Sequence, residues 1–378
     1  MTAAGSGLTT SWLVEPLSRE VALAVERLAA SDDVVRVALM PDVHLASEVC
    51  VGTVVATRRL LYPGAVGGDI GCGMCAMRFD CAADALADEA LAARLLTGLS
   101  QAIPVVRFSR PPAPRLPGEL AEQPLSSPAL ERARRESLLQ LGTLGRGNHF
   151  VELQSDEEGR LWVMLHSGSR AMGPLVRDHH LRGAQRTKSG LGALDAESEA
   201  GRAYLADVDW ALRYADHSRR AMLTAVGSLV ADVLGAPAEA DTLIACHHNA
   251  VRAEEHFGER LLVHRKGAIA AAEGEPGIIP GSMGTPSYHV IGRGVAEALG
   301  SSSHGAGRRY GRGEAARRIT ARAMERQLEG VWFDHRLAPR LRDEAPGAYK
   351  DIDDVMRAQR ELTRVVRRLR PILSYKGV

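Results

Sequence analysis

The sequence predicts an α+β fold, with mixed sheets, surrounding helices and a metal cleft at strand ends. Short β-branched runs typical of buried strands are mixed irregularly with longer helical patterns, without a βαβαβ order or an internal repeat. Candidate metal ligands recur where such runs end or beside glycine turns. The 378 residues suffice for one large or two ordinary domains, and we expect a single catalytic domain over 1–378.

The expected elements follow from periodicity and residue type. Helices are expected at 15–30, 82–100, 129–141, 196–234, 313–328 and 350–369. Strands are expected at 34–39, 51–57, 74–79, 150–154, 161–166, 241–246 and 261–265. Residues 104–128 hold seven of the eighteen prolines, which predicts a loop rather than a packed element. Because candidate ligands lie on both sides of it, we interpret this segment as an excursion from one domain.

The composition excludes several classes of protein. No run of about 18 apolar residues predicts a membrane span, and the N-terminus lacks the pattern of a signal peptide. The five cysteines, an odd number, favour reduced thiols and a cytoplasmic location. A formal net charge of +1 and 4% aromatic residues predict neither a whole-molecule field for nucleic acid nor broad base-stacking platforms. A polyanionic partner would therefore be held by local patches.

The Gly-rich stretch 63–75 carries the first chemical signal. It combines five glycines with Asp69 and Cys72, a carboxylate and a thiol three residues apart. A thiolate is a soft metal ligand and a carboxylate a harder one, so Cys72 could bridge two ions with Asp69 on one side. The alternative is a turn that enters a buried strand, with Cys72 as a small core residue, and the stretch alone favours that alternative.

Three histidines strengthen the metal interpretation. His149 follows a Gly-rich turn, His166 ends the strand at 161–166, and His248 follows the strand at 241–246. One histidine in such a place is more often a hydrogen-bonded residue than a ligand. Three of them, with Asp69 and Cys72, suit one or two ions such as manganese, zinc, iron or cobalt.

Two later segments suggest phosphate chemistry. Glycines and hydroxyls at 278–287 predict either a phosphate-binding nest or a simple turn between strands. His304 lies among glycines and is open enough to attack a phosphorus centre, with Arg308 and Arg312 near to neutralise charge. The alternative for this segment is a Gly-rich cap of the following helix. Arginine tracts at 308–326 and 364–370 are either solvated faces or contacts to a nucleic-acid backbone.

Together, these motifs closely resemble those of the RtcB family of RNA-splicing ligases. The resemblance runs from Met40 to Gly377, and its motifs occur in family order at 40–44, 63–73, 142–150, 166–170, 280–284 and 304–308. The segment 343–353 and the closing 375–377 also fit.

The resemblance implies a GTP- and manganese-dependent RNA ligase. Such an enzyme joins RNA ends bearing a 2′,3′-cyclic phosphate or 3′-phosphate to 5′-hydroxyl ends, through a guanylylated histidine and an RNA 3′-pp-G intermediate. The implied partners are RNA, GTP and an archease-like activator, and the implied task is tRNA splicing or the repair of cleaved RNA.

The resemblance also implies a role for each motif residue. His304 carries GMP, Asp42 orients its imidazole, and Arg308 is the third catalytic residue. Cys72 bridges two manganese ions; His149 and His166 complete the shell of one, and Asp69 and His248 that of the other. The implied nucleotide site, with the last two residues at the guanine, comprises Asn148, His149, Glu152, His248, Asn249, Pro280, Gly281, Ser282, Met283, Ser287, His304, Gly305, Ala306, Gly307, Tyr349 and Lys376.

The chain departs from the common family pattern at Gly68, Gly71, Pro286, Ser303 and Gly311, although no proposed ligand or nucleophile is missing. Two other functions stay open at this point. The first is a metal-dependent phosphohydrolase or cyclic phosphodiesterase, which needs the metals but not His304. The second is a nucleic-acid-binding protein with a closed, structural metal site.

Overall fold

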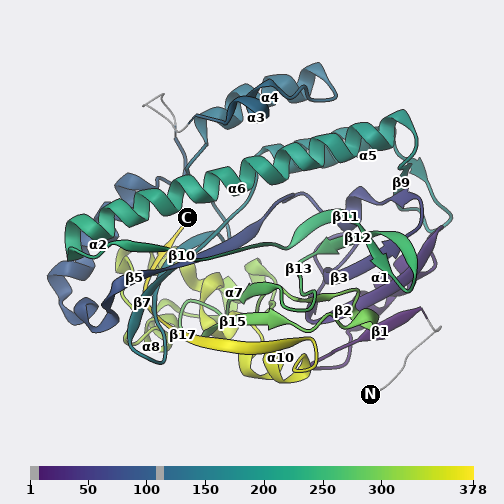
Figure 1. Ribbon diagram of the computed structural model, residues 1–378. Coiled ribbons are helices and arrows are strands. Elements are labelled where there is room, and N and C mark those ends of the chain that lie inside the picture. The colour runs from purple at the N-terminus through teal and green to yellow at the C-terminus, as the bar shows by residue number, and fades with distance from the viewer. Residues whose placement is uncertain (1–7, 108–114) are drawn as a thin grey trace.

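The computed structural model of the protein describes residues 8–107 and 115–378, and it consists of two large sheets crossed by one long helix (Figure 1). This mixture of sheets and helices confirms the expected α+β class. In the described part of the chain, no helix is both long and apolar enough to cross a membrane.

The helices and strands have the following bounds. The helices are α1 (Arg19–Ala29), α2 (Glu89–Ala102), α3 (Gly118–Glu122), α4 (Pro128–Leu139), α5 (Met172–Gly183), α6 (Glu199–Leu234), α7 (Arg312–Arg318), α8 (Ala321–Gln327), α9 (Ala338–Leu341) and α10 (Ile352–Ala358). The strands are β1 (Thr9–Ser11), β2 (Val34–His44), β3 (Val51–Thr57), β4 (Leu60–Leu61), β5 (Gly73–Ala82), β6 (Phe150–Ser155), β7 (Arg160–Ser167), β8 (Gln185–Arg186), β9 (Gly192–Asp195), β10 (Ala238–His247), β11 (Asn249–His256), β12 (Glu259–Lys266), β13 (Ala268–Ala270), β14 (Pro276–Ile279), β15 (Ser287–Gly292), β16 (Ser301–Ser303) and β17 (Thr363–Lys376).

The larger sheet determines where the site lies. Its strand order is β10-β5-β7-β6-β17-β15-β14, and all neighbouring strands are antiparallel. In an antiparallel pair, the start of one strand lies beside the end of the other. The starts of β5 and β6 therefore share one edge with the ends of β10, β7 and β17. The second large sheet has the order β1-β2-β3-β12-β11.

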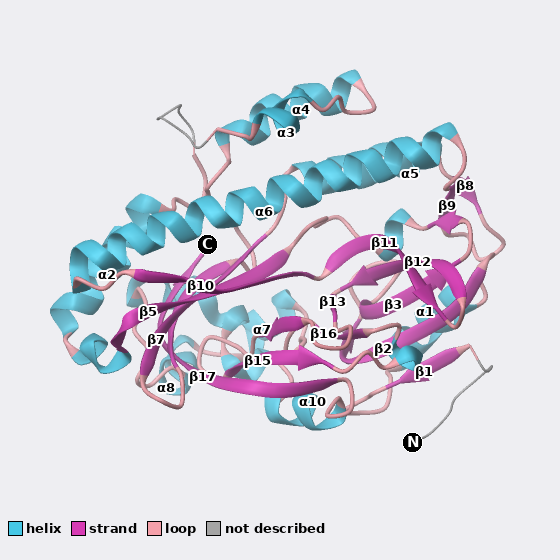
Figure 2. Cartoon of the chain, viewed as in Figure 1, coloured by secondary structure: helices cyan, strands magenta, loops and turns pink. Residues whose placement is uncertain are grey.

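The long helix α6 covers one face of the larger sheet (Figure 2). The hydroxyl of Ser198 accepts a hydrogen bond from the Gly201 N–H at 3.0 Å and caps the first turn. Gly235, with φ 70°, ends the helix in the left-handed conformation. Buried residues of α6, such as Met222 and Val226, pack with α2 and with the inward side chains of β5, β6 and β7. Helix α6 thereby supports the edge of the larger sheet where the ends of β10, β7 and β17 meet the starts of β5 and β6.

Most expected elements are confirmed, but three segments differ. The expected helix at 350–369 is wrong beyond Ala358, because strand β17 begins at Thr363. Arginine favours helices, but residues 363–369 pair with β15, and the rest of β17 continues into the pairing with β6, which together outweigh local propensity. The expected helix at 313–328 is divided into α7 and α8.

The Pro-rich segment is more ordered than a loop. Of the expected excursion at 104–128, residues 108–114 lie outside the described residues, and α3 follows them. Leu120 of α3 is buried in a cluster with α6, and its carbonyl accepts a hydrogen bond from the Trp210 indole at 2.9 Å. This apolar contact and the hydrogen bond dock a short helix here, although the surrounding prolines predict a loop.

Candidate metal centre and active site

Four of the predicted metal ligands meet at the shared edge of the larger sheet. Cys72 directly precedes β5, and His149 directly precedes β6. His166 lies at the end of β7, and His248 directly follows β10. The strand register aligns them, because Gly73 pairs with both His247 and Ser167. Strand pairing thus brings together residues that are far apart in the sequence.

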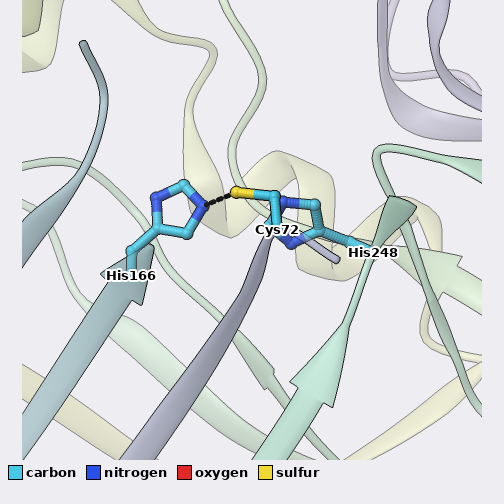
Figure 3. Close-up of side chains that lie close together, drawn as sticks. All are labelled: Cys72, His166 and His248. Atoms are coloured by element: carbon cyan, nitrogen blue, oxygen red, sulfur yellow. Dashed lines mark hydrogen bonds between the residues drawn. The ribbon is translucent and has the colours of Figure 1, made fainter. Parts of the chain in front are cut away.

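The donor atoms lie close enough to one another to bind the same metal ion. The Cys72 Sγ is 3.1 Å from His166 Nε2 and 3.7 Å from His149 Nε2. Figure 3 shows the sulfur directed at His166, with the His248 ring beside Cys72. His149 Nε2 is 3.3 Å from the Asp69 carboxylate. All five predicted ligands therefore converge.

The grouping of the donors differs from the expected one. Donor atoms within 4.8 Å of one another form two sets, which are Cys72 with His166 and His248, and Asp69 with Cys72 and His149. Cys72 is common to both sets, as expected for a bridging sulfur. The two sets differ from the expected shells of the two ions, because His149 groups with Asp69, and His166 groups with His248. This grouping rests on side-chain distances, since the neighbouring strands β7 and β6 also place His149 beside His166.

The electrostatics of the cluster fit cation binding. Burial lowers the pKa values of His166 and His248 well below the usual range, which keeps both imidazoles neutral and their lone pairs available. Burial opposes the ionisation of Asp69, but its hydrogen bond with His149 holds the pKa below the usual value. Burial raises the pKa of Cys72, and a bound divalent cation would reverse that effect by stabilising the thiolate.

The donor set also fits one or two ions by its chemistry. Each set supplies three protein ligands, which leaves coordination positions for a substrate oxygen. The buried Nδ1 of His248 has no hydrogen-bond partner among the described residues. One sulfur, three imidazoles and one carboxylate suit a transition metal such as manganese, iron, cobalt or zinc.

His304 lies next to this cluster and is held by Asp42. It follows strand β16, and its ring centroid is 4.7 Å from that of His248. Its Nδ1 is 2.6 Å from the Asp42 Oδ2, and the buried Asp42 lies in β2. Lys350 fixes this part of β2, because its Nζ donates to the carbonyls of Pro41 and Val43 at 3.1 and 3.0 Å.

Gly307 allows the His304 loop to approach strand β2. Gly307 has φ +72°, and a Cβ there would lie 2.5 Å from the Asp42 carbonyl oxygen. A larger residue at this position would push the His304 loop away from β2. The glycines around His304 are thus explained by close packing, and not by a helix cap alone.

A cavity of about 300 Å³ joins the two parts of the site. With the exception of His149, every residue of the predicted nucleotide site lines it. His149 and Asp42 lie behind the lining, each bonded to a residue within it. Lys266 is a lining residue that the sequence interpretation missed; its Nζ donates to the Val49 carbonyl at 2.7 Å, and burial lowers its pKa to about 8.

The comparisons with known proteins agree with this geometry. A family model described as tRNA-splicing ligase RtcB matches residues 24–116 and 118–377. The chain belongs to the RtcB family. Among its RtcB relatives, the RNA-splicing ligase RtcB of Escherichia coli K12 is 37% identical over 90% of both chains. The tRNA-splicing ligase RtcB of Archaeoglobus fulgidus is 30% identical over 90% of this chain and 87% of its own length.

The most important residue that sequence reasoning missed is Glu344. It is 1% exposed, and its carboxylate accepts hydrogen bonds from Lys376 Nζ at 2.7 Å and from the Tyr349 hydroxyl at 2.9 Å. Arg308 and Arg312 also donate to it. Despite burial, the charges of Lys376 and Arg308 lower its pKa to about 2. Its RtcB motif at 343–353 was recognised, but a single glutamate carries no local signal of such a role.

Arg308, which was expected to neutralise phosphate charge, bonds to groups of the protein itself. Besides Glu344, it donates to the Asp343 carbonyl at 2.8 Å and to the Tyr349 hydroxyl at 3.0 Å. Its charge is therefore already balanced by a buried carboxylate, so neutralisation of phosphate charge by Arg308 stays a prediction.

The expected phosphate nest is closed by its own hydroxyls. The Ser282 N–H donates to Thr285 Oγ1 at 2.6 Å, and the Gly281 N–H donates to Ser287 Oγ at 3.3 Å. A phosphate would have to replace these hydroxyl oxygens as the acceptor of the same N–H groups.

The departures from the common RtcB pattern have local explanations at two positions. A Cβ at Gly68 would lie 2.5 Å from the Arg177 guanidinium, which occupies that space. Gly71 has φ +72°, and a Cβ there would lie 3.1 Å from Leu212 and Ala215 of α6. Ser303 is buried in β16, and Gly311 precedes α7. Nothing in the structure explains Pro286.

Proposed function

We propose that the protein is a GTP-dependent RNA ligase that joins 3′-phosphate or 2′,3′-cyclic phosphate RNA ends to 5′-hydroxyl ends. The observation that carries this proposal is the position of His304, bonded to a buried aspartate on one side and adjacent to the donor cluster on the other. Membership of a family described as tRNA-splicing ligases supports the same reaction class.

His304 is suited to act as the nucleophile. When its Nδ1–H donates to Asp42, the ring carries its lone pair on Nε2. Nε2 attacks the α-phosphorus of GTP, so that a P–N bond forms, the bond to the β-phosphate oxygen breaks, and pyrophosphate leaves. The carboxylate of Asp42 stabilises the positive charge that develops on the imidazole.

The remaining steps transfer GMP and then release it. Water opens a 2′,3′-cyclic phosphate to a 3′-phosphate. An oxygen of that phosphate attacks the GMP phosphorus, the P–N bond to His304 breaks, and an RNA 3′-pp-G end forms. The 5′-hydroxyl of the second RNA then attacks the 3′-phosphorus, the phosphodiester forms, and GMP leaves.

The donor cluster would hold two manganese ions, with Cys72 between them, Asp69 and His149 on one side, and His166 and His248 on the other. When bound, such ions supply positive charge that polarises phosphoryl oxygens. The strand register positions Cys72, His166 and His248 without an ion, because the residues at or beside them are paired.

The far end of the cavity suits guanine. Glu152 offers a carboxyl group, and burial raises its pKa to about 8. Lys376 and Tyr349 line the same cavity, so a base there would meet one acidic, one basic and one aromatic group. RNA is the proposed macromolecular partner, with exposed arginines such as Arg309 and Arg317 as candidate phosphate contacts. An archease-like activator stays a prediction.

Guanylylation tests this function directly. The full chain is incubated with α-labelled GTP and manganese, and label that stays on the denatured protein is measured. We expect label on the wild type, none on His304→Ala, and unchanged label on the control His335→Ala, whose side chain is exposed outside the cavity.

Two outcomes would contradict the ligase. If RNA ends were processed equally well without GTP and never joined, the protein would be a phosphohydrolase. If RNA bound without turnover under any metal, it would be a binding protein.

A further inference from the structure

The buried guanidinium of Arg219 links three strands beneath the donor cluster. Arg219 lies in α6 and is 1% exposed. Its Nη1 donates to the carbonyls of Gly71 and Ser167 at 2.7 and 2.8 Å. Its Nη2 lies 3.0 Å from His247 Nδ1 and donates to it. One side chain therefore contacts the start of β5, the end of β7 and the end of β10.

The three contacts follow one pattern. Gly71 is the neighbour of Cys72 in the chain, Ser167 is the neighbour of His166, and His247 is the neighbour of His248. Cys72, His166 and His248 form one of the two donor sets. Arg219 thus bonds the residue next to each donor of that set, whereas in the other set it does so only for the shared donor Cys72.

From this pattern we infer that Arg219 is the positioning residue of the Cys72–His166–His248 metal site. It sets the spacing of the three donors by bonding two adjacent backbone carbonyls and the His247 side chain, and it adds a fixed positive charge near the sulfur. The inference rests on the metal centre of the proposed function, and it concerns one ion of that centre.

A guanidinium is suited to this task, because its planar fork donates several hydrogen bonds at fixed angles. A lysine in the same place would keep the charge but could not reproduce the three directions. Gly71 completes the arrangement, since the absence of a side chain lets α6 approach the start of β5.

Arg220 provides a matched control on the same helix. Its side chain is 55% exposed and bonds to Asp216 rather than to a strand. The variants are Arg219→Lys, Arg219→Gln and Arg220→Gln in the full chain. The measurements are cobalt binding by calorimetry, the cobalt–thiolate charge-transfer absorption, and the melting temperature without metal.

We expect Arg219→Lys and Arg219→Gln to weaken cobalt binding roughly 10–100-fold, as loss of a group that orients metal ligands typically does. The charge-transfer absorption should weaken or shift, because the sulfur and the two imidazoles are no longer held together. Arg220→Gln should match the wild type in both measurements.

If both Arg219 variants bound cobalt like the wild type and merely melted at a lower temperature, the role would be structural and the inference would be wrong. If Arg219→Gln failed to fold, Arg219→Lys and His247→Phe, which removes only one of the three contacts, would decide. A wild-type protein that bound no cobalt would contradict the metal centre itself.

Discussion

The donor cluster around Cys72 and the proposed nucleotide pocket around Tyr349 face one cavity, but they are formed by different kinds of structural element. The donors stand at the paired ends of β5, β6, β7 and β10. The nucleotide pocket is formed largely by loops, such as those around Ser282 and Gly305, and by the turn before Tyr349. The first part is positioned by backbone pairing and the second by buried ion pairs.

The charge balance of the two parts differs accordingly. In the pocket, Glu344 is balanced by Lys376 at the end of β17, by Arg312 at the start of α7 and by Arg308. In the cluster, the neutral imidazoles of His166 and His248 lie near a thiol and a partly exposed carboxylate, and Arg219 bonds to the adjacent backbone and to His247, with Asp216 at 3.9 Å. The buried carboxylate of the pocket therefore already has cationic partners, whereas the cluster gains most from an added cation. Changes in one part should consequently leave the other intact.

The largest effect is expected from Cys72→Ala. It removes the only donor common to both sets, so cobalt and manganese binding should weaken by more than about 100-fold, with loss of guanylylation. Metal content by mass spectrometry and calorimetry measures the change. The control is Cys75→Ala, because Cys75 lies in the apolar core of the same sheet. Normal metal content in Cys72→Ala would contradict the bridging role.

The sequence could predict the donors but not their grouping. Residue type and position at strand ends indicated Cys72 and the three histidines, because strand ends can be recognised locally. Which histidine groups with Asp69 depends on contacts between segments that are far apart in the sequence. For the same reason, β17 was mistaken for a helix, since its partners β6 and β15 lie far away in the sequence.

The sequence also did not indicate which charged residues are buried. Glu344, Lys350 and Arg219 each act through partners that are distant or lie in another element. In the sequence, each looks like an ordinary charged residue of a surface helix or turn. Their roles can be assigned only when the positions of their partners in the fold are known.

A smaller effect, confined to the nucleotide pocket, is expected from Glu344→Gln. The neutral amide leaves Lys376 and Arg308 without their carboxylate, so their side chains should lose their fixed positions. The KM for GTP in guanylylation should rise roughly 10-fold, and stability should fall by about 3 kcal/mol. Cobalt affinity should stay at the wild-type value. A change in the cobalt spectrum of this variant would break the proposed independence of the two parts.

The smallest effect concerns the pH dependence of stability and tests Glu152. Its folded-state pKa of about 8 lies above the ordinary value of 4.5. The protonated carboxyl therefore contributes stability that is fully present below pH 4.5 and is lost as the pH rises through 8. Gln154 donates to this carboxyl group from the same strand and supplies too little charge to reverse the effect of burial.

Glu152→Gln removes this titration while keeping the shape of the side chain. The free energy of unfolding of the wild type, relative to that of Glu152→Gln, should fall by about 2–4 kcal/mol between pH 5 and pH 8. Urea unfolding at a series of pH values measures this difference. A constant difference would mean that Glu152 is ionised at every pH tested. The proposed guanine end of the cavity would then carry a negative charge before any nucleotide binds.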